Sequence, residues 1–248
     1  MMIDDWQPRS DLLHERLILV TGAGDGIGRA AAVSFAAHGA TVILLGRTIG
    51  KLETVYDEIE QAKYPQPAIY PMNLEGATPR DYEELALTLE GEFGRLDGLL
   101  HNAAVLGTLA PIAHYDVELW YQVLQTNLTA PFLLTKACLG LLMSVPDASI
   151  VMTSDRVGRK GRAYWGAYGV AKAGLENFMQ ILADELEDNT SVRVNSVDPG
   201  PVRTRLRSQA YPAEDPASLA KPEAVLKPLL YLMGPDSRGI TGRQLTAQ

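Results

Sequence analysis

Two side chains that can move a proton, Tyr168 and Lys172, lie four residues apart in the segment "YGVAK". Residues at this spacing share one face of a helix, so both can point into the same cleft. A free tyrosine has a pKa of about 10, which makes it a poor base near neutrality. A fixed ammonium group favours the phenolate and lowers that pKa. The pair can therefore exchange a proton with a substrate oxygen, unless both residues are merely exposed on an ordinary helix.

Asp155 lies thirteen residues before Tyr168, and an ionised carboxylate only accepts hydrogen bonds, so it cannot polarise a carbonyl group. At about 4 Å and an effective dielectric constant near 20, it would raise the free energy of a phenolate by about 4 kcal/mol. One arrangement has Asp155 protonated in a dry cleft, where it donates a hydrogen bond. Another turns it outward toward Arg156 or Arg159, so that Ser154 acts in its place. In the third, Asp155 stays ionised beside Tyr168, and the site has lost its catalytic activity.

A glycine-rich turn, "TGAGDGIG" (21–28), joins an apolar run to an alanine-rich run near the N-terminus. Gly22 suits a tight turn, Gly26 lets a diphosphate approach the backbone, and Gly28 allows the next helix to pack closely. Free N–H groups and the positive end of the helix dipole then face the anion. Position 27 is isoleucine, so the G-x-G-x-x-G spacing is not met, and such turns can also be purely structural. The placement between strand and helix favours a dinucleotide site.

The end of the second apolar run bears on which dinucleotide binds. An acidic residue there normally holds the ribose hydroxyls of NAD. This run ends in "LLGRT", with Gly46 at the position of the acid and Arg47 after it. A guanidinium can pair with a 2′-phosphate, so Arg47 favours NADP over NAD. Asp25 in the glycine turn adds negative charge nearby, and a solvated arginine is the alternative.

Alternating apolar and amphipathic runs must position these residues. Strands are expected within 16–22, 41–46, 68–72, 96–104, 149–154, 191–200 and 242–248. Helices are expected within 27–39, 51–62, 79–94, 116–142, 172–188 and 222–234. Buried strands alternating with helices predict a doubly wound parallel α/β sheet of the Rossmann type, with about seven strands in one domain over 1–248.

The polar stretch 203–222 contains three prolines and is expected to form a lid-like loop. Its arginines either favour an anionic substrate or are simply solvated. The residues expected to line the substrate pocket are Tyr164, Trp165, Arg203, Arg205, Arg207 and Tyr211.

Taken together and in order, the motifs resemble those of the short-chain dehydrogenase/reductase family over nearly the whole chain. The matching segments are "TGAGDGIG", "HNAA" (101–104, an imperfect N-N-A-G), "NLTAPF" (127–132), "YGVAK" (168–172) and "DPGPVRT" (198–204). The residues around "GRKGRAYWGAYGVAKAG" and the C-terminal tail also resemble a bacterial YciK-like subgroup of oxidoreductases.

The resemblance implies hydride transfer between a nicotinamide cofactor and a carbonyl or alcohol, with Tyr168 as acid/base. It also implies that Lys172 binds the nicotinamide ribose, that Asn127 anchors a water, and that Asp155 occupies the position of the family's serine. An NADP-binding protein with weak or lost catalysis is the alternative, because of Asp155. The predicted catalytic residues are Asn127, Ser154, Asp155, Tyr168 and Lys172. The predicted cofactor-binding residues are Gly22, Asp25, Gly26, Ile27, Gly28, Arg47, Asn73, Leu74, Asn102, Ala103, Tyr168, Lys172, Pro199, Gly200, Val202 and Thr204.

Composition limits the remaining function classes. The 248 residues are 46% hydrophobic, enough for one large core, and the net charge of −8 argues against nucleic acid as a partner. The single cysteine, Cys138, excludes an internal disulfide and is expected to be a small buried residue rather than a reactive thiol. Scattered histidines predict no metal site. No signal peptide and no apolar run of about 20 residues are seen, so we expect a soluble cytoplasmic protein. The family resemblance adds a homodimer or homotetramer.

Overall fold

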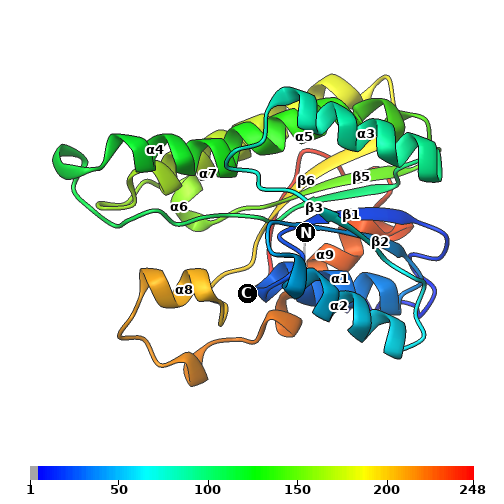
Figure 1. The fold of residues 1–248 in the computed structure, drawn as a ribbon, viewed down its shortest axis with the longest axis horizontal. Helices are drawn as coiled ribbons and strands as arrows, with labels where there is room; N and C mark the ends of the chain where they lie inside the picture. Colours follow the sequence, from blue (N-terminus) through cyan, green and yellow to red (C-terminus); the bar gives the residue numbers. More distant parts are fainter. Residues whose placement is uncertain (1–4) are drawn as a thin grey trace.

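The computed structural model describes residues 5–248, in which seven parallel strands form one sheet (Figure 1). The strands are β1 (Leu17–Thr21), β2 (Thr41–Gly46), β3 (Ala68–Pro71), β4 (Gly98–His101), β5 (Ala148–Thr153), β6 (Val192–Asp198) and β7 (Gln244–Thr246). Their order is β3-β2-β1-β4-β5-β6-β7, so the direction of strand addition reverses between β1 and β4. This is the doubly wound Rossmann sheet that the sequence predicts.

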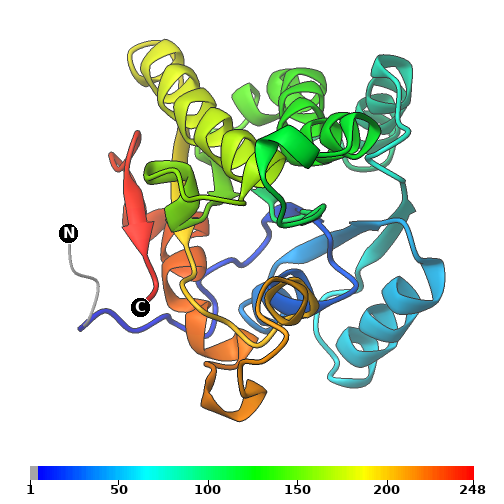
Figure 2. The same ribbon diagram turned by 90° about the vertical axis from the view of Figure 1, so that its left-hand side faces the viewer.

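Helices cover both faces of the sheet, as Figure 1 shows. One face carries α3 (Pro79–Phe93), α4 (Val117–Leu124), α5 (Ala130–Met143) and α7 (Gly166–Glu187). The other carries α1 (Gly26–Ala37), α2 (Ile49–Gln61) and α9 (Lys227–Met233). In Figure 2 the red β7 marks one edge of the sheet, and the blue-to-cyan β2 and β3 mark the other. Each face of the sheet packs against its helices in a separate hydrophobic core. Alternate residues of a strand belong to different cores, because neighbouring side chains of a strand point to opposite faces.

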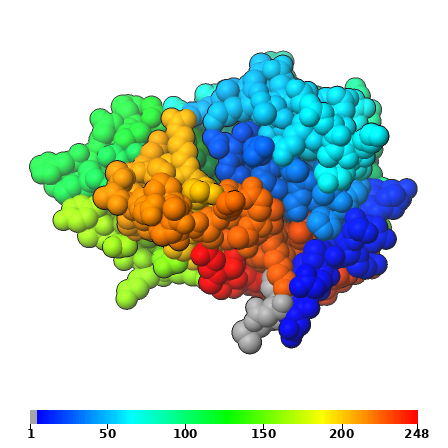
Figure 3. Space-filling model, turned by 90° about the horizontal axis from the view of Figure 1, so that it is seen from below, coloured from blue at the N-terminus to red at the C-terminus, as the bar shows by residue number. Residues whose placement is uncertain are grey.

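Two short helices that the sequence did not predict lie beside the carboxyl ends of the strands. They are α6 (Arg156–Arg159) and α8 (Arg205–Ala210), and α8 occupies the first part of the predicted lid. The segment 203–222 is therefore partly helical rather than an irregular loop throughout. Figure 3 shows this gold-to-orange segment on the same side of the molecule as the blue segment around α1. Short 3₁₀ turns complete the chain: η1 (Ile112–His114), η3 (Pro216–Ser218), η4 (Pro222–Val225) and η5 (Pro235–Ser237).

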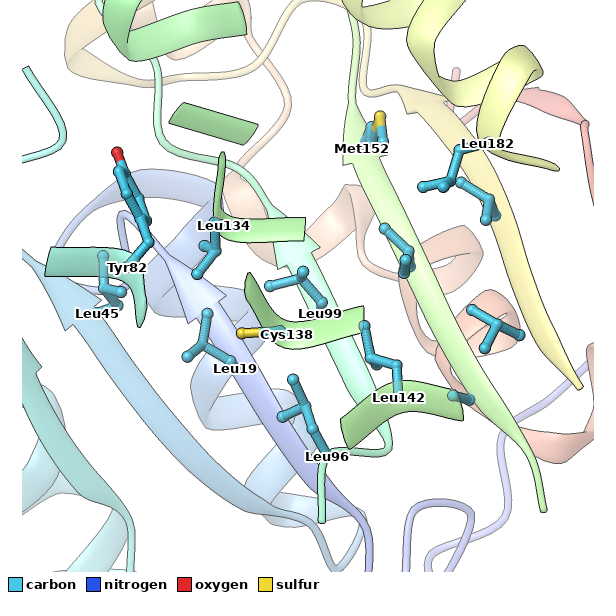
Figure 4. Close-up of a cluster of buried hydrophobic side chains, with 14 of the residues drawn as sticks. Leu19, Leu45, Tyr82, Leu96, Leu99, Leu134, Cys138, Leu142, Met152 and Leu182 are labelled. Atoms are coloured by element: carbon cyan, nitrogen blue, oxygen red, sulfur yellow. The ribbon is translucent and has the colours of Figure 1, made fainter. Parts of the chain in front are cut away.

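Cys138 belongs to α5, and its side chain lies in the core between this helix and the sheet. Figure 4 shows its sulfur among Leu19, Leu99 and other leucines of this cluster. Burial raises the pKa of the Cys138 thiol to about 12, so the reactive thiolate form is disfavoured. The prediction of a small buried residue at this position is confirmed.

The predicted helix 116–142 is observed over 117–143, but it contains a π turn, η2 (Gln125–Thr129), between α4 and α5. A π turn holds one extra residue, and such turns are frequent at functional sites. By length and hydropathy alone this long helix could cross a membrane, contrary to our expectation from the sequence. However, 44% of its most apolar window is buried inside the molecule, and core helices of soluble proteins pass the same test.

A buried cluster of charged side chains connects the amino ends of β1, β5 and β6. Asp147, just before β5, accepts hydrogen bonds from Arg16 Nη1 at 2.8 Å and from Arg193 Nε at 3.1 Å. Burial works against the Asp147 carboxylate, but the two guanidinium groups outweigh it and lower its pKa. The cluster stabilises the edge of the sheet that lies opposite the predicted site.

Candidate active site

The glycine-rich turn leaves β1 at Thr21 and enters α1 at Gly26. Gly22 has a φ of 68°, and Gly28 has no room for a side chain, because a Cβ there would lie 2.3 Å from the Gly22 carbonyl oxygen. The Asp25 carboxylate caps α1 by accepting a hydrogen bond from Gly26 N. A hydrogen bond from Lys51 lowers the pKa of Asp25. This ion pair offsets the negative charge that Asp25 brings to the turn.

The Thr21 side chain joins the ends of β1 and β4. Its Oγ1 accepts hydrogen bonds from Asn102 N at 2.9 Å and Ala103 N at 3.0 Å, and it donates to the Leu100 carbonyl at 3.2 Å. Asn102 Nδ2 donates to the Thr21 carbonyl at 3.2 Å. Two segments about eighty residues apart in sequence are thereby placed side by side at the carboxyl edge of the sheet, where ligands of doubly wound folds bind.

A hollow of about 760 Å³ lies in front of the first turn of α1. Gly26 and Thr204 approach each other at its wall, since a Cβ on Gly26 would lie 3.3 Å from Thr204 Cγ2. Two carboxylates, Asp25 and Glu223, also line the hollow, and Lys51 pairs with Asp25. The cations of the lining outnumber them, and three of these cations form no ion pair in the described part of the chain: Arg203, Arg205 and Lys221. Free cations beside the start of a twelve-residue helix suit a phosphorylated ligand. The hollow therefore fits the diphosphate of a dinucleotide.

Arg47 follows β2 at the same edge of the sheet and is exposed. Its guanidinium has no hydrogen-bond or ion-pair partner among residues 5–248. Leu52 packs over the preceding Gly46, because a Cβ at Gly46 would lie 3.2 Å from Leu52 Cδ2. Arg47 is thus a free positive charge next to the glycine-rich turn.

Tyr168 and Lys172 lie on one face of α7 and are only 4% and 3% exposed. The Lys172 ammonium donates a hydrogen bond to the Thr153 carbonyl at 2.6 Å and lies 5.7 Å from the centroid of the Tyr168 ring. Burial lowers the pKa of Lys172 to about 8, although the nearby Asp155, Glu176 and Asp198 favour its charged form. The spacing in the sequence thus brings the two side chains together, as expected.

Asp155 faces Tyr168. The tyrosine hydroxyl donates a hydrogen bond to Asp155 Oδ2 at 3.2 Å, while Oδ1 caps α6 by accepting one from Val157 N at 3.0 Å. Burial, first, and then the charge of Asp155 raise the pKa of Tyr168 well above its ordinary value. The carboxylate therefore disfavours the phenolate form of Tyr168, as expected from the sequence.

The outward arrangement of Asp155 is not the one observed. Arg159 pairs with Glu176 at 3.4 Å instead. Ser154 is buried: its backbone N–H donates to the Val197 carbonyl at 2.8 Å, and its Oγ has no hydrogen-bond partner within the described residues. The physical reason is that β5 ends at Thr153, so the next two residues leave the strand and Asp155 becomes the cap of α6.

Two buried carboxylates near this pair were not predicted from the sequence. Glu176 accepts a hydrogen bond from Ser196 Oγ at 2.7 Å, and Asp198 accepts one from Gly200 N at 2.9 Å. Both favour the charged form of Lys172, and Asp198 also raises the pKa of Tyr168. Glu176 follows Lys172 by four residues, so helical spacing could have identified it.

Aromatic rings form a wall beside Tyr168. The Trp165 ring centroid lies 5.6 Å from that of Tyr168 and 6.0 Å from that of Tyr211. Arg207 stacks 3.7 Å above Tyr211 and pairs through two 2.6 Å hydrogen bonds with Glu214. Trp165, Tyr211 and Arg207 thus lie near Tyr168.

The other predicted residues have different partners. Tyr164 is 59% exposed with a φ of 75°, and Arg203 and Arg205 line the hollow near α1. Asn127, in η2, uses its side-chain amide to bind both the N–H (2.9 Å) and the carbonyl (2.8 Å) of Val105. The remaining predicted cofactor-binding residues follow the carboxyl ends of β3 and β6 or begin α1: Asn73, Leu74, Pro199, Gly200, Val202 and Ile27.

Comparisons with known proteins agree with this geometry. A family model described as short chain dehydrogenase matches residues 16–215. The uncharacterized oxidoreductase YciK of Escherichia coli (strain K12) is 45% identical over 243 residues, which cover 98% of this chain and 96% of that protein.

Solved structures are similar over the whole fold. A short chain dehydrogenase from Pseudomonas syringae is 55% identical, with a TM-score of 0.97 and coverage of 98% of this chain and 99% of that one. One from Shigella flexneri, complexed with NADP, is 45% identical, with a TM-score of 0.94 and coverage of 97% and 100%.

Proposed function

The chain belongs to the short-chain dehydrogenase family, and on this premise we propose that it is an NADP(H)-dependent oxidoreductase acting on a small organic substrate. The cofactor exchanges a hydride with a carbon of this substrate at the carbonyl or alcohol oxidation level. The sequence predicts a carbonyl or alcohol as the reacting group. The observation that carries the proposal is the burial of Tyr168 and Lys172 together on α7, at the sheet edge that also bears the glycine-rich turn. When bound, NADPH supplies a hydride.

In this proposal the chain positions cofactor and substrate from several strand ends. The glycine-rich turn and Thr204 receive the diphosphate, and Lys172 binds the nicotinamide ribose. Tyr168 binds the reacting heteroatom of the substrate and exchanges the proton, while Asn127 anchors a water in the proton relay. The other contacts come from Asp25, Ile27, Asn73, Leu74, Asn102, Ala103, Pro199, Gly200 and Val202.

Preference for NADP(H) over NAD(H) is supported by three features. Arg47 is exposed and free to pair with a 2′-phosphate, and Lys51 offsets the charge of Asp25 nearby. A related structure is complexed with NADP. Calorimetry should therefore give tighter binding of NADPH than of NADH, and Arg47→Ala should weaken NADPH binding about tenfold or more while leaving NADH unchanged. Arg80→Ala, which removes an exposed arginine of α3, is the matched control. Tighter binding of NADH by the wild type would refute this preference.

Catalysis is tested by the oxidation of NADPH with a panel of carbonyl compounds. Tyr168→Phe removes one hydroxyl from a buried ring and should abolish turnover, while NADPH binding stays within about twofold. Unchanged turnover in this variant would remove Tyr168 from the mechanism.

A second candidate function is dinucleotide binding with weak or lost catalysis, as in a sensor or partner subunit. The hydrogen bond from Tyr168 to Asp155 favours it, because a phenol held by a carboxylate is a poor acid. This candidate predicts NADPH binding without turnover in the wild type and a large gain of carbonyl reduction in Asp155→Ser.

We also propose a homodimer or homotetramer in a reducing, cytoplasmic environment. Large apolar side chains are exposed on α4, α5 and α7, among them Tyr121, Phe132, Val170 and Ile181. The single cysteine is buried and unpaired. Light scattering should give a mass of two or four chains, and Phe132→Glu should reduce it.

A further inference from the structure

The side of Asp155 that faces Tyr168 presents hydrogen-bond acceptors. The tyrosine proton is directed to Asp155 Oδ2, so the phenol oxygen is left with its lone pairs. Asp155 Oδ2 itself has a second lone pair, because the other contact of the carboxylate is made through Oδ1 with Val157 N. A carbonyl oxygen, which only accepts hydrogen bonds, meets no donor in this pair. A substrate that brings its own N–H meets two acceptors.

The charges around Tyr168 leave an excess of negative charge. Two carboxylates, Asp155 and Asp198, act on Tyr168, and one cation, Lys172, lies beside its ring. The Lys172 ammonium points toward the Thr153 carbonyl rather than toward the tyrosine hydroxyl. A positively charged substrate group would restore the balance.

Four other charged groups of this region are paired with each other, whereas Arg162 donates a hydrogen bond to the Tyr211 hydroxyl at 3.1 Å and has no carboxylate partner among the described residues. Glu176, on α7, is bound by Arg159 of α6 and by a serine hydroxyl. Arg207, on α8, is bound through two hydrogen bonds by Glu214. Each pair carries no net charge, although the charge of Asp155 also acts on Arg207.

Aromatic rings stand next to this carboxylate. Trp165 packs at a tilt against Tyr168 and also against Tyr211, within an apolar cluster that includes Leu106 and Val157. Ring faces beside a carboxylate are the combination that binds organic cations. The site therefore suits a cation with apolar substituents.

Resting on the proposed function, we propose that the bond reduced at this site is a C=N bond in its protonated, iminium form, held by Asp155 through its N–H. The iminium carbon accepts a hydride, with its electron pair, from bound NADPH. The π pair of the C=N bond moves onto nitrogen, which keeps its proton and becomes a neutral amine, and NADP⁺ carries the positive charge. For a C=N substrate, atoms and electrons therefore balance without the proton that Tyr168 would give to a carbonyl oxygen, and Tyr168 then only helps to position the nitrogen.

The same site disfavours the corresponding step on a carbonyl. There the π pair moves onto oxygen, and an alkoxide forms beside the Asp155 carboxylate unless a proton arrives at once. Tyr168 is the nearest acid, and its proton is held by that carboxylate in an environment that raises its pKa. With the iminium, the site holds one positive charge before and after hydride transfer. No second negative charge therefore forms beside the Asp155 carboxylate at any stage.

Binding tests the proposal without turnover. Benzamidinium is a planar, non-reducible C=N cation, and benzamide is its neutral carbonyl isostere. With protein saturated with NADPH, calorimetry and tryptophan fluorescence should show benzamidinium binding at least tenfold more tightly than benzamide. Asp155→Asn should remove this preference and Asp155→Ser should reverse it, and both residues can still cap α6. Asp215→Asn, at an exposed turn, should keep it. Equal binding of the two probes by the wild type would overturn the proposal.

Turnover separates this proposal from the function on which it rests. The probes are a cyclic imine, 3,4-dihydroisoquinoline, and the ketone α-tetralone, each with NADPH. We expect the wild type to reduce the imine at least a hundredfold faster, and Asp155→Ser to shift the ratio toward the ketone. A faster reaction with the ketone in the wild type overturns the iminium proposal and leaves the oxidoreductase proposal standing. No reduction of the imine despite tight NADPH binding overturns the iminium proposal, and no turnover with the whole carbonyl panel as well overturns the oxidoreductase proposal.

Discussion

The hydroxyl of Tyr168 donates its hydrogen bond to Asp155, whose Oδ2 lies 3.2 Å away. Asp155 is fixed in this position from its other side, because its second oxygen caps the first turn of α6. The helix α6 lies tightly against α7, since a Cβ on Gly158 would lie 2.7 Å from the carbonyl carbon of Lys172. The carboxylate is therefore held against the tyrosine by the fold itself.

Replacing Asp155 by asparagine should lower the pKa of Tyr168. The substitution removes a negative charge and keeps a capping side chain for α6. Loss of this charge should lower the tyrosine pKa, because the carboxylate is one of the causes that raise it, after burial. Tyrosinate absorbance during an alkaline titration measures the change, with Tyr168→Phe in each background subtracted to isolate one phenol. Identical titrations of Tyr168 in both proteins would show that the carboxylate does not control it.

Lys172 should make the folded protein more stable as the pH rises from 8 toward 10. Its folded-state pKa is about 8, against 10.5 for the exposed group, so the unfolded chain binds more protons in this range. Between pH 8 and 9.5 the unfolding free energy should rise by about 2 kcal/mol relative to Lys172→Met. Urea unfolding of both proteins at the two pH values measures the difference. Parallel behaviour of the two proteins would contradict the lowered pKa.

Much of the fold could be predicted because it depends on local patterns. Apolar runs bounded by glycine identified the strands, and apolar residues at steps of three and four, such as Leu175, Phe178 and Leu182, identified α7. Helical spacing predicted that Tyr168 and Lys172 share one face, and the family resemblance supplied their roles. These patterns can be recognised without knowing the residue at which each strand ends.

The orientation of Asp155 could not be predicted, because it depends on that detail. Ser154 and Asp155 are adjacent, and which of them faces the cleft is decided by β5 ending at Thr153 and by α6 starting directly afterwards. The π turn around Asn127 was equally hidden, since an extra residue in one turn leaves the apolar pattern of a long helix almost unchanged. Asp198 was missed because it reaches Tyr168 only through the packing of β6 beside β5.

His101 should make the protein sensitive to mild acid. It is buried, bonds Thr135 Oγ1 at 2.8 Å, and has a pKa lowered to about 3, first by burial and then by the charge of Lys172. The unfolded chain takes up a proton near pH 6.5 and the folded one does not, so stability is lost as the pH falls below 6.5. Between pH 6.5 and 5 the loss should be about 2 kcal/mol larger in the wild type than in His101→Asn. Urea unfolding at both values measures it, and equal losses would mean that His101 is protonated in the folded protein.

Two glycine-to-alanine substitutions should have opposite effects. At Gly28 a Cβ would lie 2.3 Å from the Gly22 carbonyl oxygen and 2.5 Å from Asn102 Nδ2, so α1 must move away from the start of the glycine-rich turn and from Asn102. We expect Gly28→Ala to lower the unfolding free energy by about 2 to 3 kcal/mol and to abolish NADPH binding. A Cβ on Gly91, inside α3, would meet only the backbone of its own helix within 4 Å, so Gly91→Ala should stabilise the protein by about 0.5 to 1 kcal/mol and leave binding unchanged. Urea unfolding and calorimetry of both variants test the pair. Full NADPH affinity in Gly28→Ala would mean that binding does not need the close approach of α1 to Gly22 and Asn102.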